Sequence, residues 1–202
     1  MTKQKINSSP IGQAPPERTD RRDFLKLTAL AAGAALLPMP AQAEPVSPPR
    51  PAFPSSDPRW QKTWDAALAV LAGNIKSVPR YERLVLFEGA VYPGIWQECG
   101  PHEGLVYGTL APYVTAQEHV PTPLQVARNN HMAFFALQRP EGHESAGQIP
   151  AAIKVSDVGY GQIQMVVPIA ATAWELSQLT GDDELLVTAY AACSRWDAWL
   201  RQ

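Results

Sequence analysis

The chain has 202 residues, with 17 Lys/Arg and 19 Asp/Glu side chains and a formal net charge of −2. The first 43 residues carry six of the basic and three of the acidic side chains, so the remainder is more acidic still. Nucleic acids and anionic membranes require basic protein surfaces, so neither is expected as the main partner.

The N-terminal region has the three parts of an export signal. Two arginines precede a Phe-Leu-Lys triplet and resemble the twin-arginine (Tat) recognition motif, except that Asp20 stands where a hydroxyl residue is usual. Residues 27–37 form an apolar run, shorter than the roughly 20 residues that cross a bilayer. A small-x-small pattern then marks a cleavage site. The residues concerned are Arg21, Arg22, Phe24, Leu25 and Lys26 in the motif, and Ala41 and Ala43 at the cleavage site.

Residues 1–43 are therefore predicted to be a Tat signal peptide. We expect a bacterial protein that is periplasmic or secreted, contacts the Tat translocase during export and has no stable membrane anchor. Residues 44–57 are rich in proline, which favours a stiff, extended linker. The globular domain is expected to span residues 58–202.

Four helices are predicted in this domain. Asp57 and Pro58 suit the cap and first position of a helix that Gly73 ends. Thr122 is a candidate cap for a second helix, which ends before Pro140. Two more helices are predicted at about 167–179 and 183–200, joined by a tight turn at 180–182.

Between the first two helices, residues 84–87 favour a short strand, and residues 89–121 are predicted to be irregular. The predicted fold class is therefore mainly α, with about four helices and long loops.

Two loops carry candidate binding residues. In the first, Tyr92 and Trp96 offer flat apolar faces beside the polar groups of Glu98, His102 and Glu103. A sugar ring has an apolar C–H face and a rim of hydroxyl groups, which this combination suits. The same composition also fits a loop that simply covers the core.

The second loop places Gln162 and Gln164 just before a predicted helix, where they could face a cleft or satisfy backbone groups. His131, inside a predicted helix, is interpreted as a structural histidine. Whether Cys99 and Cys193 form a disulfide is left open. No metal or cofactor motif is present, and neither is expected.

Several segments resemble the six-hairpin glycosidases, which form an (α/α)6 toroid of twelve helices. Residues 166–182 and 195–200 resemble one of their hairpins. Residues 92–104 and 161–168 resemble substrate-side loops of the branch related to mannosylglycerate hydrolase and the trimming α-glucosidases. The resemblance implies an oligosaccharide or glycoside substrate, with Tyr92, Trp96, Glu98 and Gln164 as binding residues and His102, Glu103 and Gln162 as weaker candidates.

The resemblance does not supply catalytic residues. Glycoside hydrolysis commonly needs a carboxylic acid and a carboxylate across the scissile bond. In the family the acid follows the hairpin seen here, and the base lies much further along the chain. Twelve helices also do not fit into residues 44–202. We therefore expect the N-terminal part of an exported, inverting-type glycoside hydrolase, an incomplete toroid without its catalytic pair.

Two alternatives remain. A polysaccharide lyase is favoured by the run from Arg128 to His131, whose residue types could neutralise a uronate and move a proton. The other is a non-catalytic exported helical module that binds a sugar or a protein.

Overall fold

The computed structural model describes residues 49–53, 56–89, 91–161 and 169–202, all within one compact unit that spans Ser47–Gln202. The predicted signal peptide lies outside these residues, as do Gln162 and Gln164. The predictions made for them therefore stay predictions.

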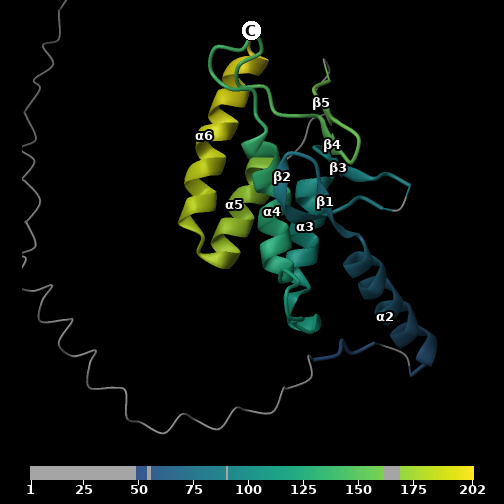
Figure 1. Cartoon of the computed structure of the whole chain (residues 1–202). Coiled ribbons are helices and arrows are strands. Elements are labelled where there is room, and N and C mark those ends of the chain that lie inside the picture. Colours follow the sequence, from purple (N-terminus) through teal and green to yellow (C-terminus); the bar gives the residue numbers. More distant parts are fainter. Residues whose placement is uncertain (1–48, 54–55, 90, 162–168) are drawn as a thin grey trace, which may run out of the picture. The chain divides into compact units, whose positions relative to one another are not determined.

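The described part of the chain is mainly helical, as expected (Figure 1). Its α-helices are α2 (Pro58–Gly73), α3 (Gly100–Thr109), α4 (Pro123–Ala136), α5 (Ile169–Thr180) and α6 (Asp183–Leu200). In Figure 1, α5 and α6 lie side by side at one edge, α4 and α3 follow, and the strands and α2 lie beyond them.

Five short strands form two antiparallel sheets. The first sheet pairs β1 (Ile75–Val78) with β2 (Tyr81–Leu86), and the second has the order β3 (Gly94–Trp96), β4 (Ala152–Lys154), β5 (Val158–Gly159). The strand expected at residues 84–87 is therefore confirmed as part of β2. Both α3 and α4 pack against β2, so the end of this strand meets the helical layer.

Local capping explains where the predicted helices begin. The Asp57 carboxylate accepts the backbone N–H of Arg59 at the start of α2. At the start of α4, Thr122 and Gln125 form a reciprocal capping box. Asp182 caps α6 by accepting the N–H of Leu185, just after Gly181 adopts a φ of 67°. The tight αα-turn predicted at residues 180–182 is confirmed.

One helix was missed. Helix α3 lies within residues 89–121, which were predicted to be irregular, and it contains helix-weakening glycines. These glycines let α3 approach α4 closely. A Cβ atom at Gly104 would lie 2.9 Å from the Cβ of Asn130, and one at Gly108 would lie 3.0 Å from the Cβ of Ala127. Tertiary packing therefore stabilises a helix that its own sequence disfavours.

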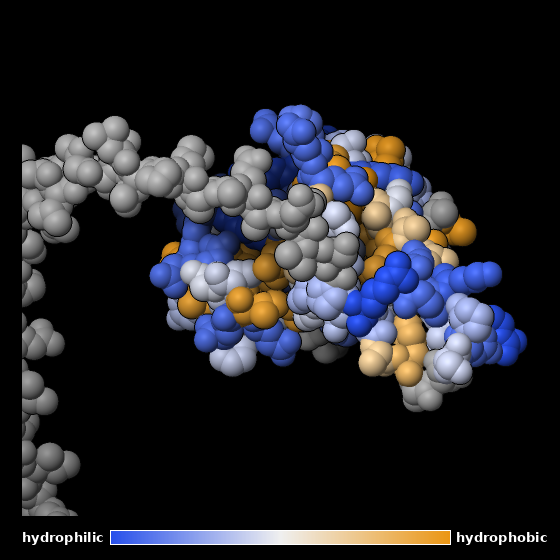
Figure 2. All heavy atoms as spheres, turned by 90° about the horizontal axis from the view of Figure 1, so that it is seen from below, coloured by the Kyte–Doolittle hydropathy of each residue, from blue (hydrophilic) through white to orange (hydrophobic). Residues whose placement is uncertain are grey.

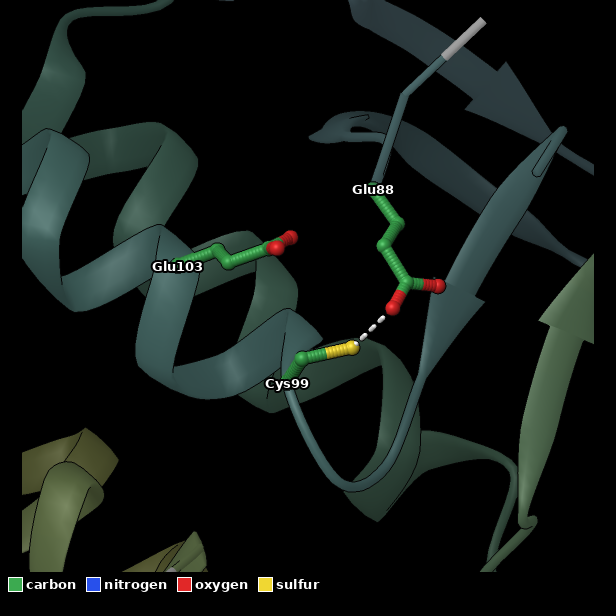
Figure 3. Close-up of side chains that lie close together, drawn as sticks. All are labelled: Glu88, Cys99 and Glu103. Carbon is green, nitrogen blue, oxygen red and sulfur yellow. Dashed lines mark hydrogen bonds between the residues drawn. The ribbon is translucent and has the colours of Figure 1, made fainter. Parts of the chain in front are cut away.

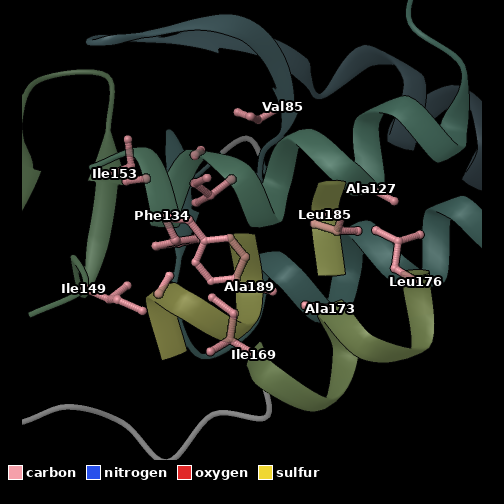
Figure 4. Close-up of a cluster of buried hydrophobic side chains, with 14 of the residues drawn as sticks. Val85, Ala127, Phe134, Ile149, Ile153, Ile169, Ala173, Leu176, Leu185 and Ala189 are labelled. Atoms are coloured by element: carbon pink, nitrogen blue, oxygen red, sulfur yellow. The ribbon is translucent and has the colours of Figure 1, made fainter. Parts of the chain in front are cut away.

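The main hydrophobic core lies between α3, α4, α5, α6 and the strands (Figure 4). Phe134 of α4 is at its centre and has no exposed surface. A second cluster joins Leu86, Tyr107 and Val126 beside the C-terminal end of α2. The C-terminal end of β2 is thus packed against the helices.

Helix α2 is only partly covered and has no fully buried residue. Phe53 packs on Trp60 and Trp64, and Trp64 also contacts Tyr113 edge to face. The described part of the predicted linker therefore packs on α2, without regular secondary structure. Trp60 remains 52% exposed, and hydrophobic patches interrupt the hydrophilic surface on the face seen in Figure 2.

No helix in the described residues is long and apolar enough to cross a membrane.

Candidate functional site

Three polar side chains converge where β2 meets the start of α3 (Figure 3). Glu88 follows β2, Cys99 is the N-cap residue of α3, and Glu103 lies in its first turn. One atom from each side chain, a carboxylate oxygen or the thiol sulfur, lies within 4.8 Å of the other two. The Cys99 thiol donates a hydrogen bond to Oε1 of Glu88 at 2.6 Å. We call these three residues the Glu-Cys-Glu cluster.

A buried amide of α4 holds the two elements together. Oδ1 of Asn130 accepts the N–H of Leu86 at 2.8 Å. Nδ2 of Asn130 donates to the carbonyl of Leu86 at 3.0 Å and to that of Gly100 at 2.8 Å. Because Leu86 ends β2 and Gly100 begins α3, this single side chain sets the spacing of the cluster.

The cluster borders a cavity of about 650 Å³. Most of its wall is apolar, formed by α2, the end of β2 and the outer face of α3. Glu88, His102, Glu103 and Tyr107 provide the ionisable groups. The full lining is Val70, Leu71, Gly73, Asn74, Leu86, Phe87, Glu88, Gly89, His102, Glu103, Val106 and Tyr107.

The electrostatic environment of the cavity is negative. Burial raises the pKa of Glu103 above its usual value, and the nearby Glu88 carboxylate raises it further. The pKa of Cys99 is also raised, first by burial and then by its hydrogen bond to Glu88 and the surrounding carboxylates. Cys99 is therefore a neutral thiol donor at neutral pH, and not a reactive thiolate.

The structure brings some of the predicted site residues together and separates others. His102 and Glu103 line the cavity, whereas Tyr92, Trp96 and Glu98 do not. Tyr92 and Trp96 form an edge-to-face pair with ring centres 5.6 Å apart. They lie on the segment next to the cluster, because the N–H of Glu88 bonds to the carbonyl of Gly94 in β3. The Glu98 side chain is exposed to solvent.

Glu88, Asn74 and Tyr107 were missed as candidates. The sequence contained one usable signal for Glu88, an acidic residue directly after an apolar strand and before a glycine. Asn74 and Tyr107 carry no such signal, because only the packing of α2 and α3 brings them to the cavity.

Both cysteines are free thiols, so the structure does not contain a Cys99–Cys193 disulfide. Cys193 lies in a separate surface groove between α5 and α6, and burial raises its pKa to about 11. In the described ranges, the Glu-Cys-Glu cluster is the one group of three or more Cys, His, Asp or Glu side chains close enough together to share a metal ion.

The four residues that favoured a lyase all have structural partners. Arg128 forms ion pairs with Asp182 at 2.7 Å and Glu184 at 2.8 Å. Asn129 donates to the carbonyl of Leu84, and the amide of Asn130 is occupied as described.

His131 completes this set and is fully buried, as its interpretation as a structural residue requires. Its Nδ1 lies 2.8 Å from the Ala127 carbonyl, which can only accept, so Nδ1 donates. In the neutral ring, Nε2 then accepts from the Thr172 hydroxyl at 2.9 Å.

Comparison of the chain with models of known families, with curated proteins and with solved structures finds no match.

Proposed function

We propose that this chain supplies the sugar-binding part of an exported glycoside hydrolase built on an (α/α)6 toroid. One observation carries the proposal: the cavity beside α3 combines an extensive apolar wall with the Glu88 and Glu103 carboxylates. Two residues that the resemblance to six-hairpin glycosidases implicates, His102 and Glu103, belong to its lining.

The chemistry of the cavity suits a carbohydrate. Val70 and Val106, which are 63% and 49% exposed, provide apolar surface for the C–H face of a sugar ring, while the two carboxylates accept hydrogen bonds from hydroxyl groups. Charge-assisted hydrogen bonds of this kind are stronger than neutral ones. Tyr92, whose side chain is 58% exposed, and Trp96 offer a further aromatic surface beside Glu88.

We assign Glu88 and Glu103 to binding and not to an inverting catalytic pair. Carboxyl groups that invert a glycosidic linkage lie about 6.5–9.5 Å apart, which leaves room for the attacking water. Oxygen atoms of Glu88 and Glu103 lie within 4.8 Å of each other, too close for that arrangement. The proposal therefore includes the expectation that this chain has no inverting pair of its own.

A lyase is less well supported. Uronate substrates need cationic groups, and the described lining of the cavity includes neither Lys nor Arg. The Arg128 guanidinium is engaged by two carboxylates.

Binding of simple neutral glycosides tests the proposal. We expect methyl α-glucoside or methyl α-mannoside to bind the full chain, as measured by saturation-transfer NMR and calorimetry. Glu103→Ala should weaken this binding by about tenfold, the equivalent of about 1.4 kcal/mol for a lost hydrogen bond to a charged group. Glu98→Ala is the matched control, because Glu98 is an exposed acid from the same segment.

Absence of binding by both sugars, or an equal loss in the two variants, contradicts the proposal. An aryl α-glycoside should also remain intact in the presence of the chain. Turnover that disappears in both Glu88→Gln and Glu103→Gln would show that the two residues are catalytic after all.

A further inference from the structure

We infer that the cavity prefers a sugar bearing a free ammonium group, such as a glucosamine glycoside, over the matching neutral sugar. The inference rests on the proposed sugar-binding function and specifies its substrate class. It is carried by the two carboxylates that meet in a largely apolar cavity without a cationic partner.

The first argument is charge complementarity. Among the described side chains, no ion pair involves Glu88 or Glu103, although ion pairs occur at other sites in the chain. Lys76 lies 5.8 Å above the ring of Phe87, but it is not part of the lining. His102 is the one other ionisable group in the lining besides Glu88, Glu103 and Tyr107. A ligand cation would therefore meet two anions and no competing Lys or Arg.

The second argument is geometric. An ammonium nitrogen forms hydrogen bonds to carboxylate oxygens at about 2.8 Å. Oxygens of Glu88 and Glu103 within 4.8 Å of each other can both be reached by one nitrogen at that distance. The Cys99 thiol occupies one oxygen of Glu88, and it donates a hydrogen without adding a positive charge.

The third argument is the cost of leaving the carboxylates uncompensated. Burial and the proximity of Glu88 both disfavour the charged form of Glu103. A bound ammonium group relieves both effects, whereas a hydroxyl group offers only a dipole. The apolar walls strengthen this difference, because low local polarity increases the interaction between charges.

The test compares three ligands of one shape. Calorimetry at pH 6, in the presence of a chelator, would measure binding of methyl α-glucosaminide, methyl N-acetyl-α-glucosaminide and methyl α-glucoside to the full chain. We expect the glucosaminide to bind at least about tenfold more tightly than the two neutral sugars, with the preference falling as salt is added.

Charge-neutralising variants locate the effect. Glu88→Gln and Glu103→Gln keep the size of each side chain and should weaken binding of the glucosaminide more than binding of methyl α-glucoside, so that the ratio of the two affinities falls to about one. Glu98→Gln removes an acidic charge outside the cavity and should retain the preference. Circular dichroism of each variant would verify its fold. The comparison of the three ligands needs only the unmodified chain, so it tests the inference even if a variant does not fold.

The outcomes separate this inference from the proposed function. If the neutral glycoside binds and the glucosaminide binds no more tightly, the inference is wrong and the sugar-binding function stands. If none of the three ligands binds, both are wrong. The titrations are then repeated without the chelator. If the preference appears only in that second series, a bridging metal ion causes it, and the inference is again wrong.

Discussion

At the scale of single residues, Asn130 links the two elements that carry the site. It contributes nothing to the cavity wall, yet its amide connects the end of β2 to the start of α3. Glu88 lies two residues beyond the first attachment point and Glu103 lies one turn beyond the second. The positions of both carboxylates thus depend on a residue of a third element.

Replacing Asn130 by Ala should destabilise the fold strongly. The change leaves one N–H and two carbonyl groups in a buried setting without their partner, which costs about 3 kcal/mol or more in unfolding free energy. Asn129→Ala is the matched control, because Asn129 makes one such hydrogen bond, to Leu84, and should cost about 1 kcal/mol. Urea unfolding of both variants measures the difference. Equal losses would contradict the role given to Asn130.

The buried His131 should make stability depend on pH. Burial lowers its pKa to about 4, against an ordinary value of about 6.5. Above pH 6.5 the ring is neutral in both states. Between pH 6.5 and 4 the unfolded chain binds a proton that the folded chain does not, so stability falls as pH falls, by about 3 kcal/mol in total.

Unfolding experiments across this pH range check the expectation. His131→Gln, whose amide does not titrate, should flatten the pH dependence between pH 6.5 and 4. His119→Gln should leave it unchanged, because the His119 side chain is 90% exposed. A steep pH dependence that survives in His131→Gln would assign the effect to other groups.

At the scale of elements, two parts of the fold are stabilised differently: the turn between α5 and α6 by local contacts, and helix α3 by tertiary packing. The turn follows local chemistry, since Gly181 adopts a left-handed conformation and Asp182 caps the next helix. Helix α3 depends on tertiary packing, because its glycines allow it to lie close against α4. Sequence patterns detect the first kind of element and miss the second.

Substitution of Gly181 by Ala should destabilise the hairpin by about 1 kcal/mol, because φ at this position is 67° and a Cβ atom strains that conformation. No neighbouring atom would contact the added methyl group, so the effect isolates backbone strain. Gly73→Ala is the control. It also has open space, lies within α2 without a positive φ, and should be neutral or slightly stabilising. Thermal unfolding that ranks the two variants the other way would refute the assignment.

At the scale of the whole molecule, helices α5 and α6 expose several large apolar side chains among the described residues. Trp174 of α5 is 57% exposed, and Val187 and Tyr190 of α6 are 68% and 78% exposed. Trp174 and Tyr190 also line the groove of about 410 Å³ between these helices.

The chain should therefore associate as its concentration rises. Sedimentation velocity over a hundredfold range of concentration should show species larger than a monomer. The double variant Val187→Lys/Tyr190→Lys should shift the chain towards the monomer. Val91→Lys, at a valine outside this region that is 81% exposed, should have little effect. A chain that stays monomeric throughout would instead favour a self-contained helical module.

The sequence by itself determined the helical class and most of the helix ends, because caps such as Asp57, Thr122 and Asp182 act on backbone groups within three residues. It also identified His102 and Glu103 as candidates. Only the tertiary structure decided that Glu103 meets Glu88 and Cys99, that His102 lines the same cavity, and that Glu98 does not. The physical reason is that the cluster depends on contacts of α4 with β2 and α3, between residues 30 and 44 positions apart, which no local pattern encodes.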